Sequence, residues 1–409
     1  MEKPISALEI TSSGVKLAVG YVYQHEVYIL HALESSRARL VKGNILDNEE
    51  MVIAIKELVN QASKELGIPI DSVVLGLPST GLEVVSRRGE TNTTDPNSKI
   101  CDFDASNCIS MINKQKGMDK VNKELIDIVP YQYILDGNKT YEHFPKNKVS
   151  KVITMVADSE FMDQAYVKMF TSVVIKAGLK IDKQVNVTNA AIKYLGDFDI
   201  KANEYVFIHI GGHMTTIGFA YDNRLAKAQV LNFGSENISQ DIAKKFDISL
   251  EKANHYKCVY GIAKNPDFDF VTPDGFTIQA LADVIQESLD KLVNSINDFL
   301  ITIEETARNL FILSGGGSNL YGLDTFLANV FQNKILRFTP NVYGARNKAY
   351  TNCVSLIKYY AEYEIHTSPT RPYDLTLTRV QPVVDGKTGT EKKKEEEDPL
   401  MTDLNDERL

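Results

Sequence analysis

Apolar and polar positions alternate along the first part of the chain. The alternation covers residues 5–10, 15–23 and 26–33, and short turns rich in Gly, Ser and Thr separate the three runs. A period of two residues is typical of strands with one buried face, so these runs predict three antiparallel strands in a meander. A helical period follows from about Asn48 and should end at Gly67, and a further strand is expected at residues 72–76.

The same order of elements recurs in the second half of the chain. Residues 205–210, 214–221 and 224–233 again predict three strands, and a helix is expected over residues 237–245. Two copies of one supersecondary unit within one chain indicate an internally duplicated α/β fold.

A different pattern separates and follows these two copies. Residues 83–158 predict an inserted subdomain that is polar and turn-rich at 87–97, then helical, then strand-like at 126–135 and 149–156. Helices are expected at 161–178 and 276–305, a strand at 310–313 and another helix from Leu323. Beyond about residue 367 the chain is punctuated by proline and almost entirely charged over residues 391–398, which predicts a disordered tail.

Composition narrows the class of protein. The 409 residues are 43% hydrophobic and 24% charged, as in globular proteins, and a net charge of −9 argues against nucleic acid as a partner. No leader-like start and no apolar run of about 18 residues is present, so we expect neither secretion nor a membrane span. The cysteines match neither a zinc site nor a disulfide scaffold and are expected to be reduced thiols of a cytoplasmic protein: Cys101, Cys108, Cys258 and Cys353.

Three turns rich in glycine or hydroxyl side chains each follow an apolar strand, at residues 9–14, 210–214 and 314–317. Backbone N–H groups in such turns can converge on an anion, and glycine lets a phosphate or an adenine ring approach the main chain. Glycine also marks ordinary turns, so the pattern leaves a nucleotide site and a purely structural role both open.

Several longer segments carry a family resemblance. They are ALEI at residues 7–10, VKGNILD at 41–47 and IVPYQYILDG at 128–137, followed by residues 234–243, 257–261, 313–317 and 350–359. Over about residues 5–365 the sequence resembles the FtsA family of bacterial cell-division proteins, which belongs to the actin, sugar-kinase and heat-shock chaperone superfamily. The motif at 128–137 is the most specific, because actin and the chaperones have a differently placed subdomain.

The resemblance implies an actin-like, duplicated two-lobe fold with an FtsA-type inserted subdomain. It divides the chain into a first lobe core (1–82, 159–200 and 340–366), the insert (83–158), a second lobe core (201–235 and 301–339), an accessory subdomain (236–300) and the tail (367–409). It also implies a nucleotide between the lobes, self-association into filaments, and docking of the C-terminal peptide of the tubulin-like protein FtsZ near residues 236–300.

The resemblance also assigns candidate contacts to ATP. Ser12, Ser13 and Lys16 match the first phosphate loop, and Gly211 and Gly212 match the second. The remaining candidates line the cleft or the adenosine end of the site: Met214, Thr215, Gly234, Asn237, Lys257, Gly315, Gly316, Gly317 and Ser318.

Departures from the family pattern concern the metal and hydrolysis. His209 stands where the family has the Asp that holds Mg²⁺ through water, and Thr216 stands where a second carboxylate is expected. Glu9 is the only carboxylate in these loops and is therefore the candidate metal ligand, while Thr11 replaces a glycine and Asn254 replaces a glutamate. We therefore expect nucleotide binding that is weak or independent of Mg²⁺, with hydrolysis largely lost. His209 and His213 either fill a disused site or contact phosphate as cations.

The last twelve residues lack the basic amphipathic helix with which FtsA-type chains usually end. Acidic side chains flank Leu400, Met401 and Leu404, so a solvated tail or a partner-binding peptide is expected rather than a membrane anchor. A cytoplasmic protein acting at the division site is the main interpretation. The alternatives are an active ATPase of the superfamily and a nucleotide-free structural protein resembling the pilus assembly protein PilM.

Overall fold

A computed structural model describes residues 4–115, 122–198, 200, 202–262, 270–303, 309–340, 342–345 and 347–363. The predicted tail at 367–409 and the end of the helix predicted at 276–305 lie outside these residues. No helix in the described part of the chain combines the length and the apolar composition needed to cross a membrane.

The first sheet is built on the N-terminal meander. Its strands lie in the order β11-β6-β1-β2-β3, in which β1, β2 and β3 are antiparallel while β6 and β11 run parallel to β1. The short strands β4 and β5 pair with each other beside this sheet. The bounds are β1 Ile5–Ile10, β2 Val15–Tyr23, β3 Glu26–Ser35, β4 Leu40–Val41, β5 Asn44–Ile45, β6 Ser72–Leu77 and β11 Lys180–Asn186.

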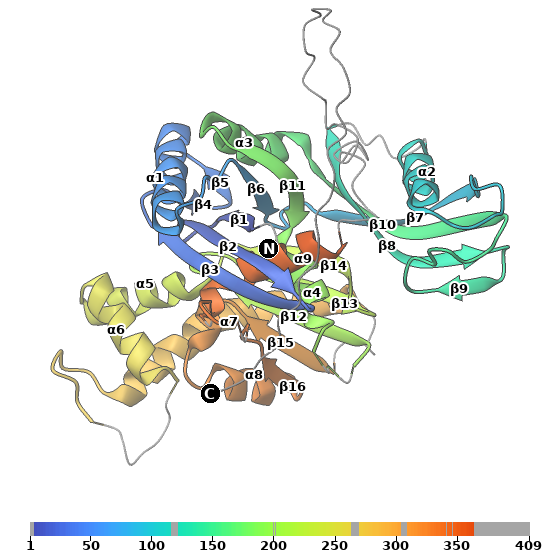
Figure 1. Cartoon of the computed structure of the whole chain (residues 1–409). Helices are drawn as coiled ribbons and strands as arrows, with labels where there is room; N and C mark the ends of the chain where they lie inside the picture. The colour runs from blue at the N-terminus through green and yellow to red at the C-terminus, as the bar shows by residue number, and fades with distance from the viewer. Residues whose placement is uncertain are drawn as a thin grey trace, which may run out of the picture. The chain divides into compact units, whose positions relative to one another are not determined.

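The second sheet repeats the first. Its order is β14-β13-β12-β15-β16, so three antiparallel strands are again followed by two that run parallel to the first strand of the meander (Figure 1). This repetition confirms the predicted duplication. The bounds are β12 Glu204–Ile210, β13 Thr215–Tyr221, β14 Arg224–Leu231, β15 Leu310–Ser314 and β16 Lys334–Arg337.

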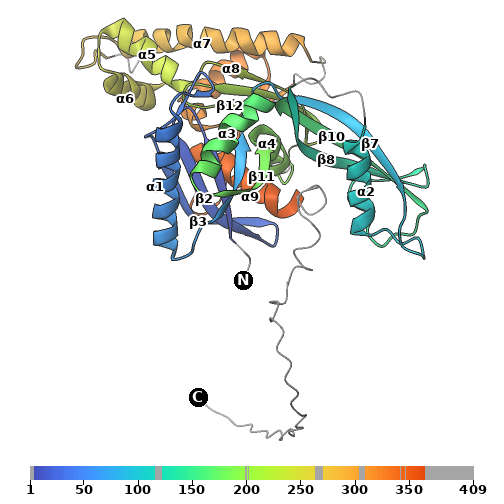
Figure 2. The same cartoon turned by 90° about the horizontal axis from the view of Figure 1, so that it is seen from above.

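Helices cover both faces of each sheet, as Figure 2 shows. Helices α1 and α3 pack on one face of the first sheet, α4 and α9 fill the space between the two sheets, and α5 to α8 pack on the far face of the second sheet. Three separate apolar clusters therefore hold the layers together. The bounds are α1 Asn48–Leu66, α3 Gln164–Lys176, α4 Val187–Leu195, α5 Ser235–Phe246, α6 Leu250–Tyr260, α7 Ile278–Ile301, α8 Leu323–Phe331 and α9 Thr351–Tyr363.

Helix α1 illustrates how closely the sequence sets local structure. The Asp47 carboxylate accepts hydrogen bonds from the amides of Glu49 and Glu50, which otherwise have no partner in the first turn. At the other end Gly67 adopts φ 67°, a left-handed conformation that ends the helix at low cost. The predicted bounds of this helix are confirmed.

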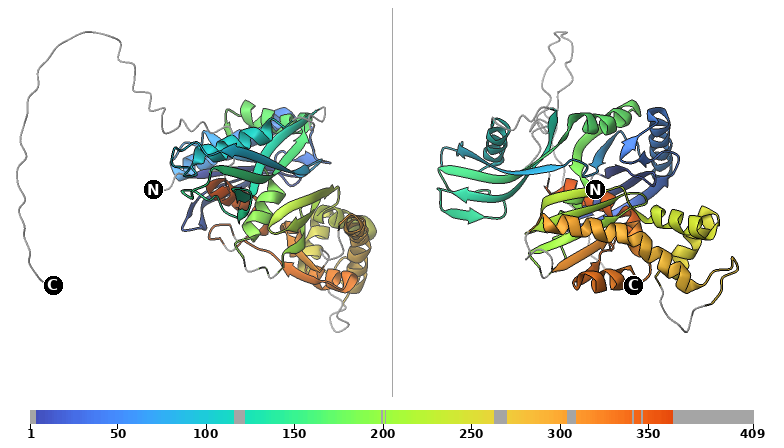
Figure 3. Two further views of the ribbon diagram at one scale, coloured as in Figure 1. Left: turned by 90° about the vertical axis from the view of Figure 1, so that its right-hand side faces the viewer. Right: turned by 180° about the vertical axis from the view of Figure 1, so that it is seen from behind.

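The inserted subdomain is a four-stranded sheet in the order β7-β10-β8-β9 with α2 packed against it (Figure 3). Helix α2 encloses a small core with β8 and β10, in which Cys108 and Met155 are fully buried. The bounds are β7 Glu83–Asn92, α2 Asp102–Asn113, β8 Lys123–Leu135, β9 Lys139–Tyr141 and β10 Val152–Asp163.

Two local predictions in and after the insert are wrong. Residues 87–92, predicted as a polar turn-rich segment, belong to β7, where the buried Arg87 guanidinium stacks 4.8 Å from the ring centroid of Phe161. Phe161 and Met162, predicted to start a helix, end strand β10, and Asp163 caps α3 through the amides of Ala165 and Tyr166. In both places strand pairing within the sheet of the insert, between β10 and its neighbours β7 and β8, overrides the local pattern.

Buried charges join the insert to both lobes. Lys183 of β11 lies 3.0 Å from the Asp127 carboxylate of β8, which also accepts a 2.6 Å hydrogen bond from the Tyr359 hydroxyl of α9. Arg224 of β14 donates to both oxygens of Asp158 at 2.8 and 3.0 Å. Glu160 is enclosed beside these carboxylates, and burial, with Asp127 and Asp158, raises the pKa of its carboxyl well above the ordinary range despite the opposing lysines.

Replacing Glu160 by Gln is expected to stabilise the protein near neutral pH. An unfolded chain releases the carboxyl proton near the ordinary pKa of 4.5, whereas the folded protein retains it to a higher pH. Between the two pKa values the unfolded state binds fewer protons, so the free energy of unfolding of the native protein falls as pH rises. Glutamine has no such proton, so the variant's advantage should vanish below the ordinary pKa and grow towards neutrality.

Urea unfolding of the native protein and the variant across this pH range measures the difference. Glu142→Gln, at an exposed bend of the insert, serves as the control because it removes an exposed carboxyl. Identical pH profiles for Glu160→Gln and the native protein would show that the Glu160 carboxyl does not carry a raised pKa.

Candidate functional site

The first predicted phosphate loop joins β1 to β2 and folds around the side chain of Thr11. The Thr11 hydroxyl oxygen accepts hydrogen bonds from the amides of Ser13 at 3.2 Å and Gly14 at 3.1 Å. The same hydroxyl donates to the Gly14 carbonyl at 2.9 Å. Two amides that could point at an anion therefore converge on an oxygen of the chain itself.

The second predicted phosphate loop joins β12 to β13 and touches the first. The amide of His213 donates to the Ser12 hydroxyl oxygen at 3.1 Å, so one hydrogen bond links the turns of the two sheets directly. The Gly211 amide donates within its own turn to the Met214 carbonyl at 2.9 Å. The structure thus brings together the loops that the sequence predicted, and their amides bond to the protein.

The N-terminus of α5 lies against the second loop. The amides of Ser235 and Glu236 donate to the carbonyls of Gly211 and Gly212 at 3.0 and 2.7 Å. Helix N-termini are ready-made anion sites, but here carbonyl oxygens occupy that position. Gly234 is required for this approach, because a Cβ atom there would lie 2.4 Å from the Gly212 carbonyl oxygen.

Two further candidates support the cap of α5 and the adjoining strand. The Asn237 side-chain oxygen accepts a 2.9 Å hydrogen bond from the Gly234 amide. The fully buried Thr215 hydroxyl donates to the Phe233 carbonyl at 2.8 Å. Both side chains therefore hydrogen-bond to backbone groups of the protein itself.

Lys16 and Glu9 face each other across β1 and β2 and are buried together against the start of α9. The Lys16 ammonium donates to the Ala349 carbonyl at 2.8 Å, and the Asn352 side-chain amide donates to the Glu9 carboxylate at 2.5 Å. Burial raises the pKa of Glu9, although Lys16 and Asn352 act in the opposite direction. The candidate phosphate cation and the candidate metal ligand are thus both bonded to residues near the start of α9.

His209 ends β12 and lies opposite Ser314 in the parallel pair of β12 and β15. Its buried Nδ1 atom and the Ser314 hydroxyl have no hydrogen-bond partner in the described part of the chain. Burial, reinforced by Lys16, lowers the pKa of His209 to about 4, so the ring is neutral at neutral pH. Burial and Arg39 also lower the pKa of His213, although Glu236 raises it.

The adenosine end of the candidate site lies between α5, α6 and the loop after β15. The Lys257 ammonium is buried and donates to the Ser235 carbonyl at 2.8 Å and the Ser239 hydroxyl at 2.7 Å. The Ser318 hydroxyl donates to the Gly315 carbonyl at 2.8 Å. Within the same turn a side chain at Gly317 would meet Ile210, whereas one at Gly316 would enter open space.

A triphosphate held by Mg²⁺ needs convergent amide donors and a carboxylate-anchored cation. The amides of Ser13, Gly14 and His213 already donate to hydroxyl oxygens, and a neutral histidine occupies the expected Asp position. Among the described residues, no group of three or more His, Cys, Asp and Glu side chains could hold a metal ion. In this arrangement the residues of the two loops therefore do not fit Mg²⁺ and the triphosphate.

The sequence analysis located the loops but missed the residues that hydrogen-bond to the candidate side chains. Asn352 and Ala349 are more than 300 residues away from the side chains that they contact. The available signal was the polar Asn352, which is buried in the first turn of α9. Thr11 was recognised as a replacement for glycine, whereas its role as the acceptor for two loop amides was not.

Known proteins similar to this chain include cell-division proteins. The sequence model of the family described as "Cell division protein FtsA" matches residues 206–355. The chain is 24% identical over 367 residues to cell division protein FtsA of Enterococcus faecalis, covering 87% of this chain and 83% of that protein. It is also 24% identical to cell division protein FtsA of Bacillus subtilis, covering 86% of this chain and 82% of that protein.

Solved structures agree on the fold. The PilM–PilN type IV pilus biogenesis complex aligns with a TM-score of 0.59 at 16% identity, covering 88% of this chain and 98% of that chain. MreB5 of Spiroplasma citri bound to ADP aligns with a TM-score of 0.51 at 11% identity, covering 87% of this chain and 96% of that chain. At these identities the likeness concerns the actin-like fold alone. Together with the family match and the relatives that align over most of the chain, it supports a divergent relative of the FtsA cell-division proteins with an actin-like fold.

Proposed function

We propose that the protein is a cytoplasmic adaptor of the division machinery, which binds the C-terminal peptide of FtsZ and self-associates through its actin-like body. Similarity to FtsA proteins over most of the chain supports the general role. The observation that carries the partner assignment is a basic groove in residues 236–300, the accessory subdomain to which the resemblance assigns FtsZ docking.

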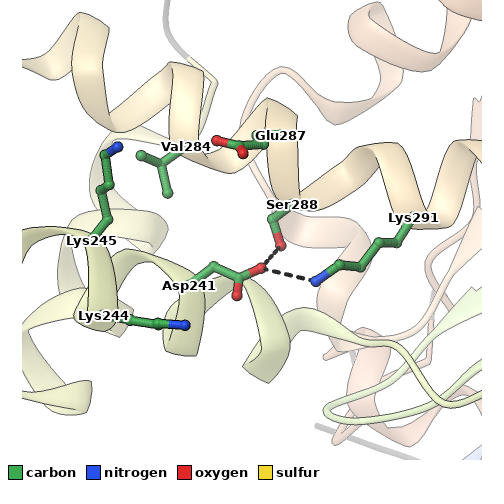
Figure 4. Close-up of a pocket in the computed structure, with 7 residues that line it drawn as sticks. All are labelled: Asp241, Lys244, Lys245, Val284, Glu287, Ser288 and Lys291. Atoms are coloured by element: carbon green, nitrogen blue, oxygen red, sulfur yellow. Dashed lines mark hydrogen bonds and ion pairs between the residues drawn. The ribbon is translucent and has the colours of Figure 1, made fainter.

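The groove lies between helices α5 and α7 and has a volume of about 470 Å³ (Figure 4). One of its two carboxylates, Asp241, accepts a 2.7 Å hydrogen bond from the Ser288 hydroxyl and lies 3.7 Å from the Lys291 ammonium. The lining residues are Asp241, Lys244, Lys245, Val284, Glu287, Ser288 and Lys291.

The chemistry of this lining fits a peptide with acidic side chains beside an apolar one. Three lysines against two carboxylates leave the lining with one net positive charge. The Lys291 side chain is 67% exposed and is therefore accessible to a partner, while Val284 supplies an apolar contact. Complementary charge of this kind guides association and sets specificity more than it adds affinity.

The same proposal gives hydrolysis no part in the adaptor's action. Phosphoryl transfer depends on a positioned metal and on a residue that orients the nucleophile. His209 and Thr216 occupy the positions where the family pattern has carboxylates. We therefore expect the purified protein to release no phosphate from ATP in a Mg²⁺-dependent manner, and observed turnover would reject this part of the proposal.

Reversing two charges in the groove is expected to weaken binding of the FtsZ C-terminal peptide by about tenfold or more, which corresponds to about 1.4 kcal/mol. The variant is Lys245→Glu with Lys291→Glu, and fluorescence anisotropy of a labelled peptide measures the dissociation constant. Binding to the native protein should also weaken as salt is raised, because exposed charges are screened.

The matched control reverses two exposed lysines on α1, Lys56→Glu with Lys64→Glu, and so changes net charge by the same amount on the first lobe. Its affinity should remain that of the native protein. Equal weakening in both variants would mean that net charge, rather than the groove, governs binding. A folded native protein that does not bind the peptide would favour the alternative of a PilM-like structural component.

A further inference from the structure

Beyond the adaptor role, we infer that the protein's own hydroxyl groups hold the two lobes closed, so that closure does not need a nucleotide. Thr11 takes up the amides of the first loop, and Ser12 bonds the second loop to the first. The interaction between Ser12 and His213 is called the loop latch below. The inference concerns the cleft and is independent of the peptide groove between α5 and α7.

Thr11 supplies the oxygen on which the first loop closes. Its hydroxyl accepts from the amides of Ser13 and Gly14 and lies 2.9 Å from the Ser13 hydroxyl oxygen. A glycine, the residue of the family pattern at this position, has no such oxygen. Those amides would then need water or an external anion, because an unpaired buried amide is costly.

Beside the latch, the space between Gly212 and the first loop is about that of one methyl group. Ser12 is 5% exposed, and a Cβ atom built on Gly212 would lie 3.8 Å from the Ser12 hydroxyl oxygen and 3.7 Å from the Ser13 Cβ atom. The two loops are therefore bonded at Ser12 and leave only a narrow gap beside Gly212, where a phosphate group would have to enter. Binding a phosphate between the loops would require breaking the hydrogen bond between Ser12 and His213.

Charges around the loops also oppose an anion. The Ser13 hydroxyl lies 3.3 Å from the Glu34 carboxylate, and the Glu236 side chain lies close to Gly212. On the attractive side, Arg39 acts on His213 of the second loop, while the Lys16 ammonium is buried and bonded to the Ala349 carbonyl. Carboxylates beside a phosphate repel it, and a cation already bonded elsewhere compensates less well.

Thr11→Gly is the variant that tests the inference, with Thr11→Ser as the matched control that keeps the hydroxyl oxygen. The melting temperature of the native protein and of Thr11→Ser should not change when ATP is added, with or without Mg²⁺. Thr11→Gly should melt at a lower temperature without ATP and should gain an ATP-dependent increase. Its affinity for a fluorescent ATP analogue should rise at least about tenfold over the native protein.

Two further results decide the matter. Ser12→Ala, which lacks the latch oxygen, should expose the turn around residues 211–214 to proteolysis, whereas Ser12→Thr should remain protected.

If Thr11→Gly does not fold, Thr11→Ala removes the same oxygen while keeping a Cβ atom, and the same gain of ATP response is expected. A clear rise in the melting temperature of the native protein with ATP, or equal ATP responses in the hydroxyl-free variant and in Thr11→Ser, would overturn the inference.

Discussion

The hydrogen bond from the His213 amide to the Ser12 hydroxyl joins two turns that belong to different sheets. Helices α4 and α9 fill the space between those sheets, and the buried contacts of Glu9 and Lys16 tie the first sheet to the start of α9. Contact between the lobes at the cleft thus continues into a shared apolar core. Close-packed layers transmit atomic displacements, so a shift of these turns would displace packed residues in both lobes.

The peptide groove and the cleft lie on different parts of helix α5. The first turn of the helix bonds to the carbonyls of Gly211 and Gly212, whereas its later residues Asp241, Lys244 and Lys245 line the groove. One rigid element therefore connects the loop latch to the proposed partner site. In an adaptor that does not hydrolyse ATP, this connection would hold the groove in one arrangement rather than switch it with each nucleotide.

Sequence patterns predicted most of the elements and the duplicated topology, although successive residues of β1, β2 and β12 are buried on both faces of their sheets. It was wrong at residues 87–92 and at Phe161, where the pairing between β7 and the long strand β10 decides the conformation. The glycine turns of the site were located correctly from their position after apolar strands. Their hydrogen-bond partners were not, because Thr11 bonds within its own turn and Asn352 reaches Glu9 from the far end of the sequence.

Hydrogen–deuterium exchange at the amides of Ser13, Gly14 and His213 in the nucleotide-free protein tests the closed cleft most directly. These amides donate to the hydroxyl oxygens of Thr11 and Ser12, so the account predicts slow exchange without nucleotide and no further slowing when ATP and Mg²⁺ are added. Fast exchange of all three amides in the free protein, followed by protection when ATP is added, would contradict it and would identify a cleft that closes on nucleotide.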